Sequence, residues 1–170
     1  MNTKEPLQLD NTGTGKIGSI RVSSSLSTKN KMLKILKETR EYYSKDPDNR
    51  RCITEDGDCM YTWGDNHCAI GRYMDEEYQF ETWKQNNESV IELMDSEYNE
   101  YNDIDWCLRD DVHGLDVDFW RDLQGLHDTC SNWITNDSVN LEQLPTGISP
   151  QGIAKYHAIQ LKIEEGRYDG

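Results

Sequence analysis

Three residues of this chain could together activate a thiol: Cys68, His127 and Asp128. The thiolate is the nucleophilic form of cysteine, a histidine can accept the thiol proton, and a carboxylate can orient the histidine. We predict Cys68 near the start of a helix, where the helix dipole stabilises a thiolate. The order Cys, His, Asp is compatible with a cysteine hydrolase, and this set is our enzymatic hypothesis.

Two features argue against catalysis. His127 and Asp128 are neighbours on a predicted helix, so we expect their side chains to point about 100° apart and not to pair. Cys68 is followed by Ala69-Ile70-Gly71, a pattern typical of close packing. We therefore assign no catalytic residue and favour a structural role for Cys68 and His127.

Cysteine and histidine also bind metal ions, and the available ligands are Cys52, Cys59, Cys68, His67 and His127. Structural zinc sites usually contain pairs of ligands two to four residues apart. Here six residues separate Cys52 from Cys59, and eight separate Cys59 from Cys68. We predict no metal and no cofactor. A disulfide between Cys59 and Cys68 is an alternative, although free thiols are expected in a reducing compartment.

Arg72 lies among apolar residues of the same predicted helix. A guanidinium binds anions through two parallel hydrogen bonds, so a pocket near Cys68, Arg72 and His127 is a hypothetical site for a nucleotide signal. The simpler interpretation is an arginine at the edge of the core that bridges a carboxylate such as Asp128, or backbone carbonyls. We favour the simpler interpretation.

Acidic residues are concentrated in the middle of the chain. The 170 residues carry a net charge of −14, and residues 75–128 hold 3 Lys or Arg and 17 Asp or Glu, so 3 − 17 = −14 in this stretch alone. Such a field repels nucleic acid and anionic membranes and attracts a basic protein surface. The predicted partner-binding residues are Glu92, Glu97, Asp103, Asp105, Asp110 and Asp111.

The same carboxylates have three other interpretations. They could be solvated helix faces, they could bind a cation, or they could pair with the lysines near the start of the first predicted helix. The sequence contains no Asp-x-Asp-x-Asp-Gly calcium loop. Partner binding remains our preferred hypothesis.

Hydrophobic periodicity predicts a mainly α (α+β) fold, a single-domain helical bundle with one small β-hairpin. Residues 1–27 are predicted as a flexible tail and 28–166 as the globular domain. Asp116 caps the most strongly amphipathic segment, which we place at the centre of the core. The hairpin is expected to turn at Asp56-Gly57. The predicted helices are 29–45, 66–75, 88–101, 117–134 and 150–165, and the predicted strands are 51–54 and 59–63.

The chain has no apolar run of roughly 20 residues and its first residues lack the apolar core of a signal peptide. We therefore expect a cytoplasmic protein with no membrane partner. The oligomeric state is not predicted.

Three short motifs lie in the middle of the chain: a C-x-Y segment, a C-A-[VI]-G-R helix, and an L-Q-x-L-H-D helix followed by Trp. Here they are Cys59 with Tyr61, Cys68 to Arg72, and Leu123 to Asp128 with Trp133. The two stretches that contain them resemble a family of small proteins from bacteriophages and related bacterial mobile elements, which share these motifs. The resemblance covers roughly residues 45–135 and implies a phage-type origin rather than a particular chemistry.

The charge distribution and this resemblance together suggest a phage-type accessory protein that is not an enzyme. It would bind and inhibit a host protein, such as a defence or nucleic-acid enzyme, through its acidic surface in the host cytoplasm. The alternative is a cysteine-dependent enzyme, or a protein that sequesters a nucleotide signal, built on Cys68, Arg72 and His127.

Overall fold

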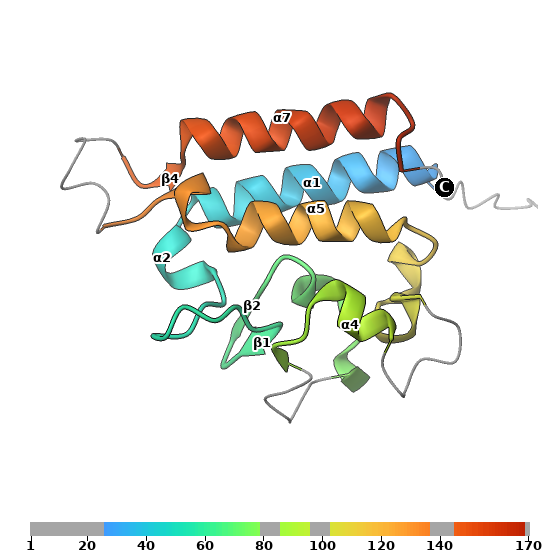
Figure 1. Cartoon of the computed structure of the whole chain (residues 1–170), viewed down its shortest axis with the longest axis horizontal. Coiled ribbons are helices and arrows are strands. Elements are labelled where there is room, and N and C mark those ends of the chain that lie inside the picture. The colour runs from blue at the N-terminus through green and yellow to red at the C-terminus, as the bar shows by residue number, and fades with distance from the viewer. Residues whose placement is uncertain (1–25, 79–85, 96–102, 137–144, 169–170) are drawn as a thin grey trace, which may run out of the picture.

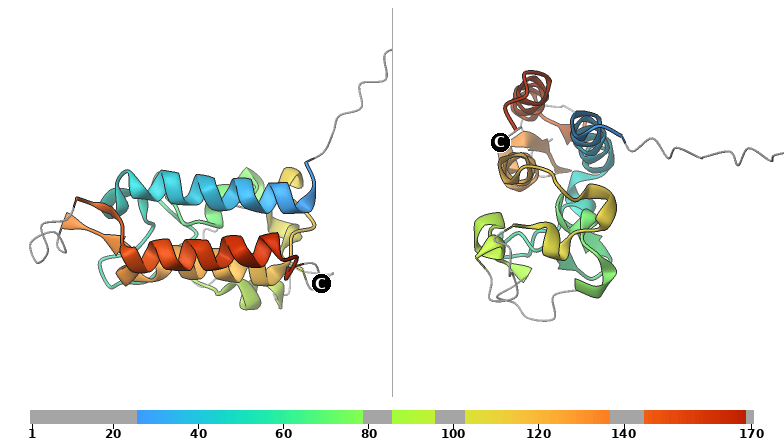
Figure 2. Two further views of the ribbon diagram at one scale, coloured as in Figure 1. Left: turned by 90° about the horizontal axis from the view of Figure 1, so that it is seen from above. Right: turned by 90° about the vertical axis from the view of Figure 1, so that its right-hand side faces the viewer.

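Three long helices lie side by side in one half of the molecule (Figure 1). The computed structural model describes residues 26–78, 86–95, 103–136 and 145–168. Seen along their axes, the three helices form a triangle. The second of them in chain order, Val117–Asp128, faces the other half of the molecule (Figure 2). The mainly α fold class and the central position of the helix after Asp116 are confirmed. The long helices are α1 (Thr28–Ser44), α5 (Val117–Asp128) and α7 (Pro150–Glu164).

Side-chain caps fix where the outer two helices begin. The hydroxyl of Ser27 accepts a hydrogen bond from the backbone N–H of Asn30, so α1 begins at Thr28, one residue before its predicted start at residue 29. Ser149 caps α7 by accepting from the N–H of Gly152 at 3.0 Å, and Pro150 takes the first helical position, as predicted. The face of α1 that enters the core carries Met32, Ile35, Leu36, Thr39 and Tyr43.

The central helix α5 is shorter than predicted, because it ends at Asp128 and not at residue 134. Thr129 leaves the helix in an extended conformation, and Trp133 enters the core from strand β3 (Trp133–Ile134). Within α5 the predicted apolar stripe is confirmed. Its fully buried members are Phe119, Trp120, Leu123 and Leu126.

The other half of the molecule is built from short elements and irregular chain. It contains one two-stranded antiparallel hairpin, and a second hairpin lies beside the long helices. The described residues therefore form two hairpins, whereas the sequence predicted one. The short elements of the described residues, in both halves, are α2 (Pro47–Arg50), β1 (Thr62–Trp63), β2 (Asn66–His67), η1 (Gly71–Tyr73), η2 (Glu76–Tyr78), α4 (Val90–Met94), η3 (Asp105–Cys107), η4 (Asp110–Val112), η5 (Cys130–Asn132), β3 and β4 (Gly147–Ile148).

The hairpin prediction was wrong in its register. The predicted strands 51–54 and 59–63 meet in a single bridge between Ile53 and Cys59, and the ladder instead joins Thr62 to His67 and turns at Gly64. The helix predicted at 66–75 is also replaced by β2 and the short η1. Pairing across the hairpin decides this, because the carbonyl of Tyr61 accepts from the N–H of Cys68 at 3.0 Å.

Two further predictions fall partly outside the described residues. The helix expected at 88–101 is seen as α4, which begins with a capping box between Ser89 and Glu92, and residues 96–102 lie outside the description. Nearly all of the tail expected at 1–27 also lies outside it. Among the described helices, none is both long and apolar enough to cross a membrane.

Replacing Gly71 by alanine should destabilise the protein by about 1–3 kcal/mol, the usual cost of overpacking. A Cβ atom at this position would collide with the backbone carbonyl oxygen of Tyr61. The control is Gly125→Ala in α5, where an added Cβ meets no heavy atom within 4 Å. This control should be neutral or stabilising by up to about 1 kcal/mol, because alanine favours helix interiors. Urea unfolding followed by tryptophan fluorescence measures both changes, and equal effects would contradict the packing argument.

Candidate functional site

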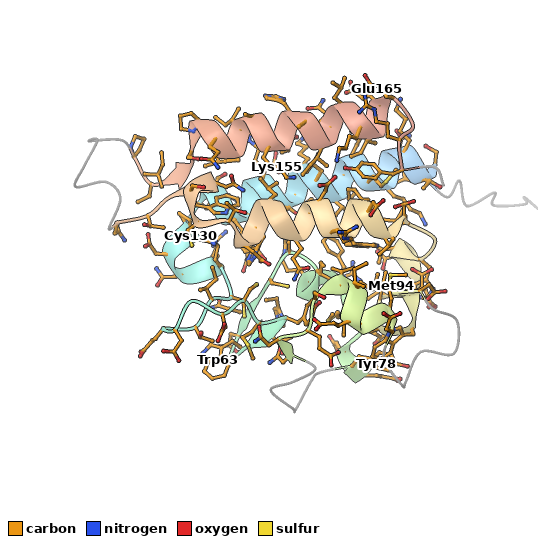
Figure 3. All side chains as sticks on the ribbon, viewed as in Figure 1. Trp63, Tyr78, Met94, Cys130, Lys155 and Glu165 are labelled. Atoms are coloured by element: carbon orange, nitrogen blue, oxygen red, sulfur yellow. The ribbon has the colours of Figure 1, made fainter. Side chains whose placement is uncertain are left out.

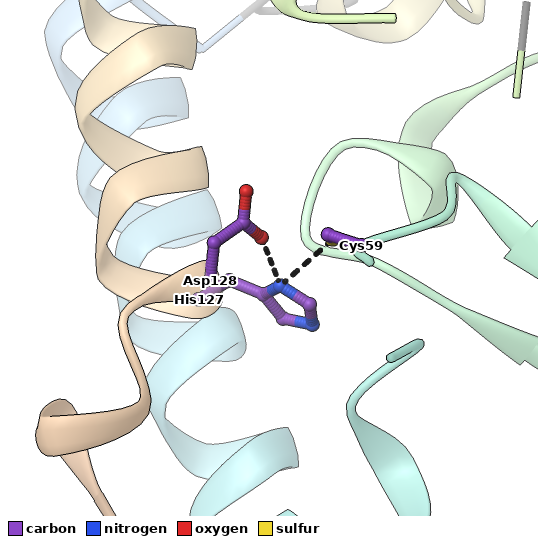
Figure 4. A group of neighbouring side chains, drawn as sticks. All are labelled: Cys59, His127 and Asp128. Atoms are coloured by element: carbon purple, nitrogen blue, oxygen red, sulfur yellow. Dashed lines mark hydrogen bonds and ion pairs between the residues drawn. The ribbon is translucent and has the colours of Figure 1, made fainter. Parts of the chain in front are cut away.

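The thiol of Cys59, the imidazole of His127 and the carboxylate of Asp128 converge at the end of α5 (Figure 4). The Sγ atom of Cys59 lies 3.7 Å from Nδ1 of His127, and Oδ1 of Asp128 lies 2.7 Å from the same nitrogen. The expectation that neighbouring His127 and Asp128 could not pair was wrong. Because the helix ends at Asp128, that carboxylate can turn back toward the imidazole.

Burial sets the charge state of this group. His127 is completely buried, which lowers the pKa of its imidazole although the Asp128 carboxylate acts in the opposite direction. The pKa of the Cys59 thiol is raised far above its usual value, first by a hydrogen bond with Cys68 and then by burial and the nearby carboxylate. The imidazole is therefore neutral and the thiol protonated at neutral pH.

This geometry does not make a catalytic triad. In a triad one ring nitrogen receives the nucleophile's proton while the other is held by the carboxylate. Here Cys59 and Asp128 both approach Nδ1, and Nε2 has no hydrogen-bond partner among the described residues. The histidine cannot accept a proton from the thiol while donating to the carboxylate through the same atom.

Cys68, the thiol chosen from the sequence, contacts Cys59, and the thiol that lies next to His127 is that of Cys59. It is buried against Cys59, and its Sγ accepts a hydrogen bond from the N–H of Gly71 at 3.3 Å. The five cysteines are free thiols, so the alternative disulfide between Cys59 and Cys68 is not formed. From the sequence Cys59 was considered only as a metal ligand or a disulfide partner, and its contact with His127 was not predicted because the two residues are 68 positions apart.

Side chains from two other segments hold the end of α5. The last carbonyls of a helix lack intrahelical partners and must be satisfied in another way when they are buried. Arg51 donates from Nε to the carbonyl of His127 and from Nη2 to that of Asp128, both at 2.9 Å. Asn132 and Trp133 donate to the carbonyl of Leu126 at 3.0 and 3.1 Å. The backbone of both site residues is thereby fixed.

A hollow of about 510 Å³ opens beside this group. Cys59 and Asp128 line it on one side, and the segment that leads into α4 lines it on the other. Asn86 holds that segment in place, because its side-chain amide exchanges two hydrogen bonds with the backbone of Thr62, at 2.9 and 2.7 Å. Solvent can therefore reach the thiol and the carboxylate, while the imidazole stays covered.

Arg72 occupies a different position from the one predicted. Its guanidinium stacks on the ring of Tyr42 at 4.1 Å, and the residue that bridges the carbonyl of Asp128 is Arg51. The Nη1 atom of Arg72 is buried without a hydrogen-bond partner among the described residues. A hollow of about 220 Å³ beside Arg72 also contains Asp75 and Glu76, whose carboxylates oppose anion binding.

The acidic segments of the middle of the chain pack against one another. The indole of Trp106 donates to the carbonyl of Leu93 at 3.0 Å and meets the ring of Tyr78 edge-on at 5.3 Å. The N–H of Asp75 donates to the carbonyl of Cys107, also at 3.0 Å. Figure 3 places the labelled Tyr78 and Met94 at the same end of the molecule, away from Trp63. We call the exposed carboxylates of segments 75–78, 92–95 and 103–111 the acidic face.

Several predicted docking residues also have local structural contacts. Glu92 closes the capping box of α4, and Asp105 accepts from the N–H of Gly114 at 2.7 Å. Asp103 accepts from the N–H of Asp105, and Asp111 pairs with Arg109 at 3.0 Å. Asp110 is fully exposed, and Glu97 lies outside the described residues.

The first helix does not neutralise the acidic face through the lysine contacts that the structure shows. Lys34 pairs with Glu38 and Lys37 with Glu41, each within α1. Lys29 donates to the carbonyl of Glu164 at the end of α7. These lysines support the long-helix half of the molecule instead.

Asp122 joins α5 to α7 on the side away from the acidic face. Its carboxylate accepts from Lys155 at 3.1 Å and from Lys162 and Tyr168 at 2.6 Å each. Burial alone would raise the pKa of Asp122, but these three hydrogen bonds outweigh burial and leave its pKa below the usual value.

Comparisons with known proteins give no relative from which to transfer a function: no family model, no curated protein and no solved structure matches this chain.

Replacing Arg51 by lysine should lower the free energy of unfolding by about 1–3 kcal/mol. A single ammonium cannot reproduce the forked pair of hydrogen bonds, so one of the two carbonyls loses the donor that Arg51 supplies, although Trp133 still donates to the carbonyl of His127 at 3.0 Å. The control is Arg121→Lys, since Arg121 makes an exposed pair with Asp118 and the exchange should cost less than about 0.5 kcal/mol. Chemical denaturation measures both variants, and a neutral Arg51→Lys would refute the capping role.

Replacing Asp122 by asparagine should cost about 1–3 kcal/mol at pH 7, because charged hydrogen bonds are lost. A carboxyl whose folded pKa is lowered stabilises the protein above its unfolded pKa and loses that contribution as pH falls. The difference between wild type and variant should therefore shrink below about pH 4. Urea unfolding at pH 7 and pH 3 tests this, with Asp118→Asn as the exposed control. A pH-independent difference would contradict it.

Proposed function

We propose that the protein is a binding protein whose acidic face docks onto a basic surface of another protein. The observation that supports it best is the contact of Trp106 with both Leu93 and Tyr78. These contacts gather three acidic segments, far apart in the sequence, into one neighbourhood. A single-signed field of this kind steers and orients a partner of opposite charge.

The carboxylates of the acidic face remain available for a partner. Glu76, Glu77 and Asp95 are exposed, and none of the three forms an ion pair with a residue that the structure describes. The lysines of α1 pair with glutamates of their own helix. The local contacts of Glu92, Asp103 and Asp105 hold the chain in shape and do not cancel their negative charge.

The partner class follows from the resemblance to phage and mobile-element proteins. In that setting a host protein is the expected partner. A basic groove that normally holds nucleic acid is complementary to such a face, so a defence or nucleic-acid enzyme would be inhibited by being covered. Inhibition of a host defence or nucleic-acid enzyme is therefore part of the proposal.

The enzymatic alternative has less support. Cys68 interacts with Cys59 and forms no hydrogen bond with His127, and both Cys59 and Asp128 approach the same imidazole nitrogen. An anion pocket at Arg72 is opposed by the neighbouring carboxylates. Neither arrangement favours a second candidate function.

The test uses charge reversals that leave local structure intact. Glu76, Glu77 and Asp95 are changed together to lysine, because reversing Glu92 or Asp105 would also break a cap or turn. The control reverses Glu55, Asp56 and Asp58, three exposed carboxylates of a loop outside the acidic face. Both triple variants change the net charge by the same amount.

A tagged full-length chain is used to capture a partner from host lysate, and the affinity for the purified partner is then measured at several salt concentrations. We expect binding that weakens steeply with salt, a loss of at least about tenfold in the acidic-face variant and little change in the control. Salt-independent binding, or equal losses in both variants, would overturn the proposal.

A further inference from the structure

We propose that Cys59, His127 and Asp128 form a binding site for a zinc ion. One donor atom from each residue, Sγ, Nδ1 and a carboxylate oxygen, lies within 4.8 Å of the other two. Thiolate sulfur, imidazole nitrogen and carboxylate oxygen are the three ligand types that zinc takes in proteins. This site is separate from the acidic-face proposal and does not depend on it.

The distances suit a tetrahedral ion after a small movement. With usual zinc–ligand bond lengths, two donors of a tetrahedral site lie about 3.3–3.6 Å apart. The 3.7 Å between Cys59 Sγ and His127 Nδ1 is already near this value. The 2.7 Å between Nδ1 and Asp128 Oδ1 is a hydrogen-bond distance and must open by about 0.6 Å as the ion replaces the proton. Asp128 is partly exposed and has room to move.

Sharing of one nitrogen favours an ion over a proton at the centre of this group. A single N–H at Nδ1 can be given to Asp128, and the Cys59 thiol, which lies beside the same nitrogen and also interacts with Cys68, must then share the Asp128 carboxylate as its acceptor. The thiol's other backbone contact is to the carbonyl of Met60 at 4.0 Å. A metal ion accepts electron pairs from several directions at once, and therefore satisfies all three side chains together.

Charge and protons balance in the bound state. Cys59 loses its proton to solvent and binds as thiolate, while the proton at Nδ1 of His127 is transferred to Nε2. The two negative charges of Cys59 and Asp128 then neutralise a divalent cation in a site that is largely buried. One proton is released for each ion bound, so the affinity should rise with pH.

The surroundings hold the ligands and leave one position open. Arg51 fixes the backbone of His127 and Asp128 through their carbonyls. The hollow of about 510 Å³ borders Cys59 and Asp128, so solvent can supply the fourth donor. Cys68 is not assigned as a ligand, because its sulfur does not belong to the group of donor atoms that lie within 4.8 Å of one another.

The experiment uses the full chain, stripped with EDTA under reducing conditions and titrated with Zn²⁺ and with Co²⁺. Zinc is followed by competition with a chromophoric chelator, and cobalt by its thiolate charge-transfer absorption. We expect one ion per chain with tetrahedral cobalt spectra, and a higher melting temperature in the presence of zinc. Absence of stoichiometric binding, or cobalt spectra without a thiolate band, would overturn the proposal.

Variants locate the ion. Cys59→Ser and Asp128→Asn should each weaken zinc binding by at least about tenfold, with circular dichroism of the metal-free chain confirming that both fold. Cys130→Ser is the matched control, since Cys130 is an exposed thiol just after the same helix. Cys68→Ser and the Glu76, Glu77, Asp95 triple variant should keep one zinc per chain. Equal loss in Cys130→Ser, or loss of the ion in Cys68→Ser, would refute the three-ligand assignment.

Discussion

The buried end of α5 is the constraint on which the rest of the structure depends. A helix that stops inside a protein exposes carbonyl groups to a medium without water, and each needs a donor. Arg51 supplies donors from the irregular half, while Asn132 and Trp133 supply them from the chain that follows the helix. This solution brings the segment of Arg51 and the chain after the helix to one point, and it places His127 and Asp128 beside Cys59.

Local patterns were sufficient to predict the long helices. The apolar repeats of α1, α5 and α7 and the Ser149-Pro150 start were visible in the sequence because these signals act within a few residues. The end of α5 was placed too late, since its apolar stripe continues through Trp133 although the backbone does not. The helix is stopped by side-chain hydrogen-bond donors to its last carbonyls, and the hydrophobic periodicity of the sequence does not reveal them.

The candidate site was predicted only in part, for the same reason. His127 and Asp128 were singled out from the sequence, but their partner was taken to be Cys68 and the nearby cation Arg72. The structure places Cys59 and Arg51 there, through pairings of 68 and 76 residues in sequence separation. Spacing rules for zinc ligands also considered cysteine and histidine alone, so the carboxylate of Asp128 was overlooked.

The acidic composition of the middle of the chain has two physical sources. Short helices and tight turns need acceptors for their free N–H groups, and Asp103, Asp105 and Asp116 fill that role. Composition cannot separate such carboxylates from those that only face solvent. The structure makes the distinction, and within residues 26–78, 86–95, 103–136 and 145–168 it shows no such local contact for the side chains of Glu76, Glu77 and Asp95.

The side chain of Tyr43 couples the candidate site to the fold of α1. Its hydroxyl donates to the carbonyl of His67 at 2.6 Å, and its ring packs edge-on against His127 at 4.5 Å. One side chain of the first long helix thus touches both the hairpin and the imidazole. Detachment of that helix during folding or proteolysis would uncover the imidazole at once, so the site and the fold of the amino-terminal helix must be gained and lost together.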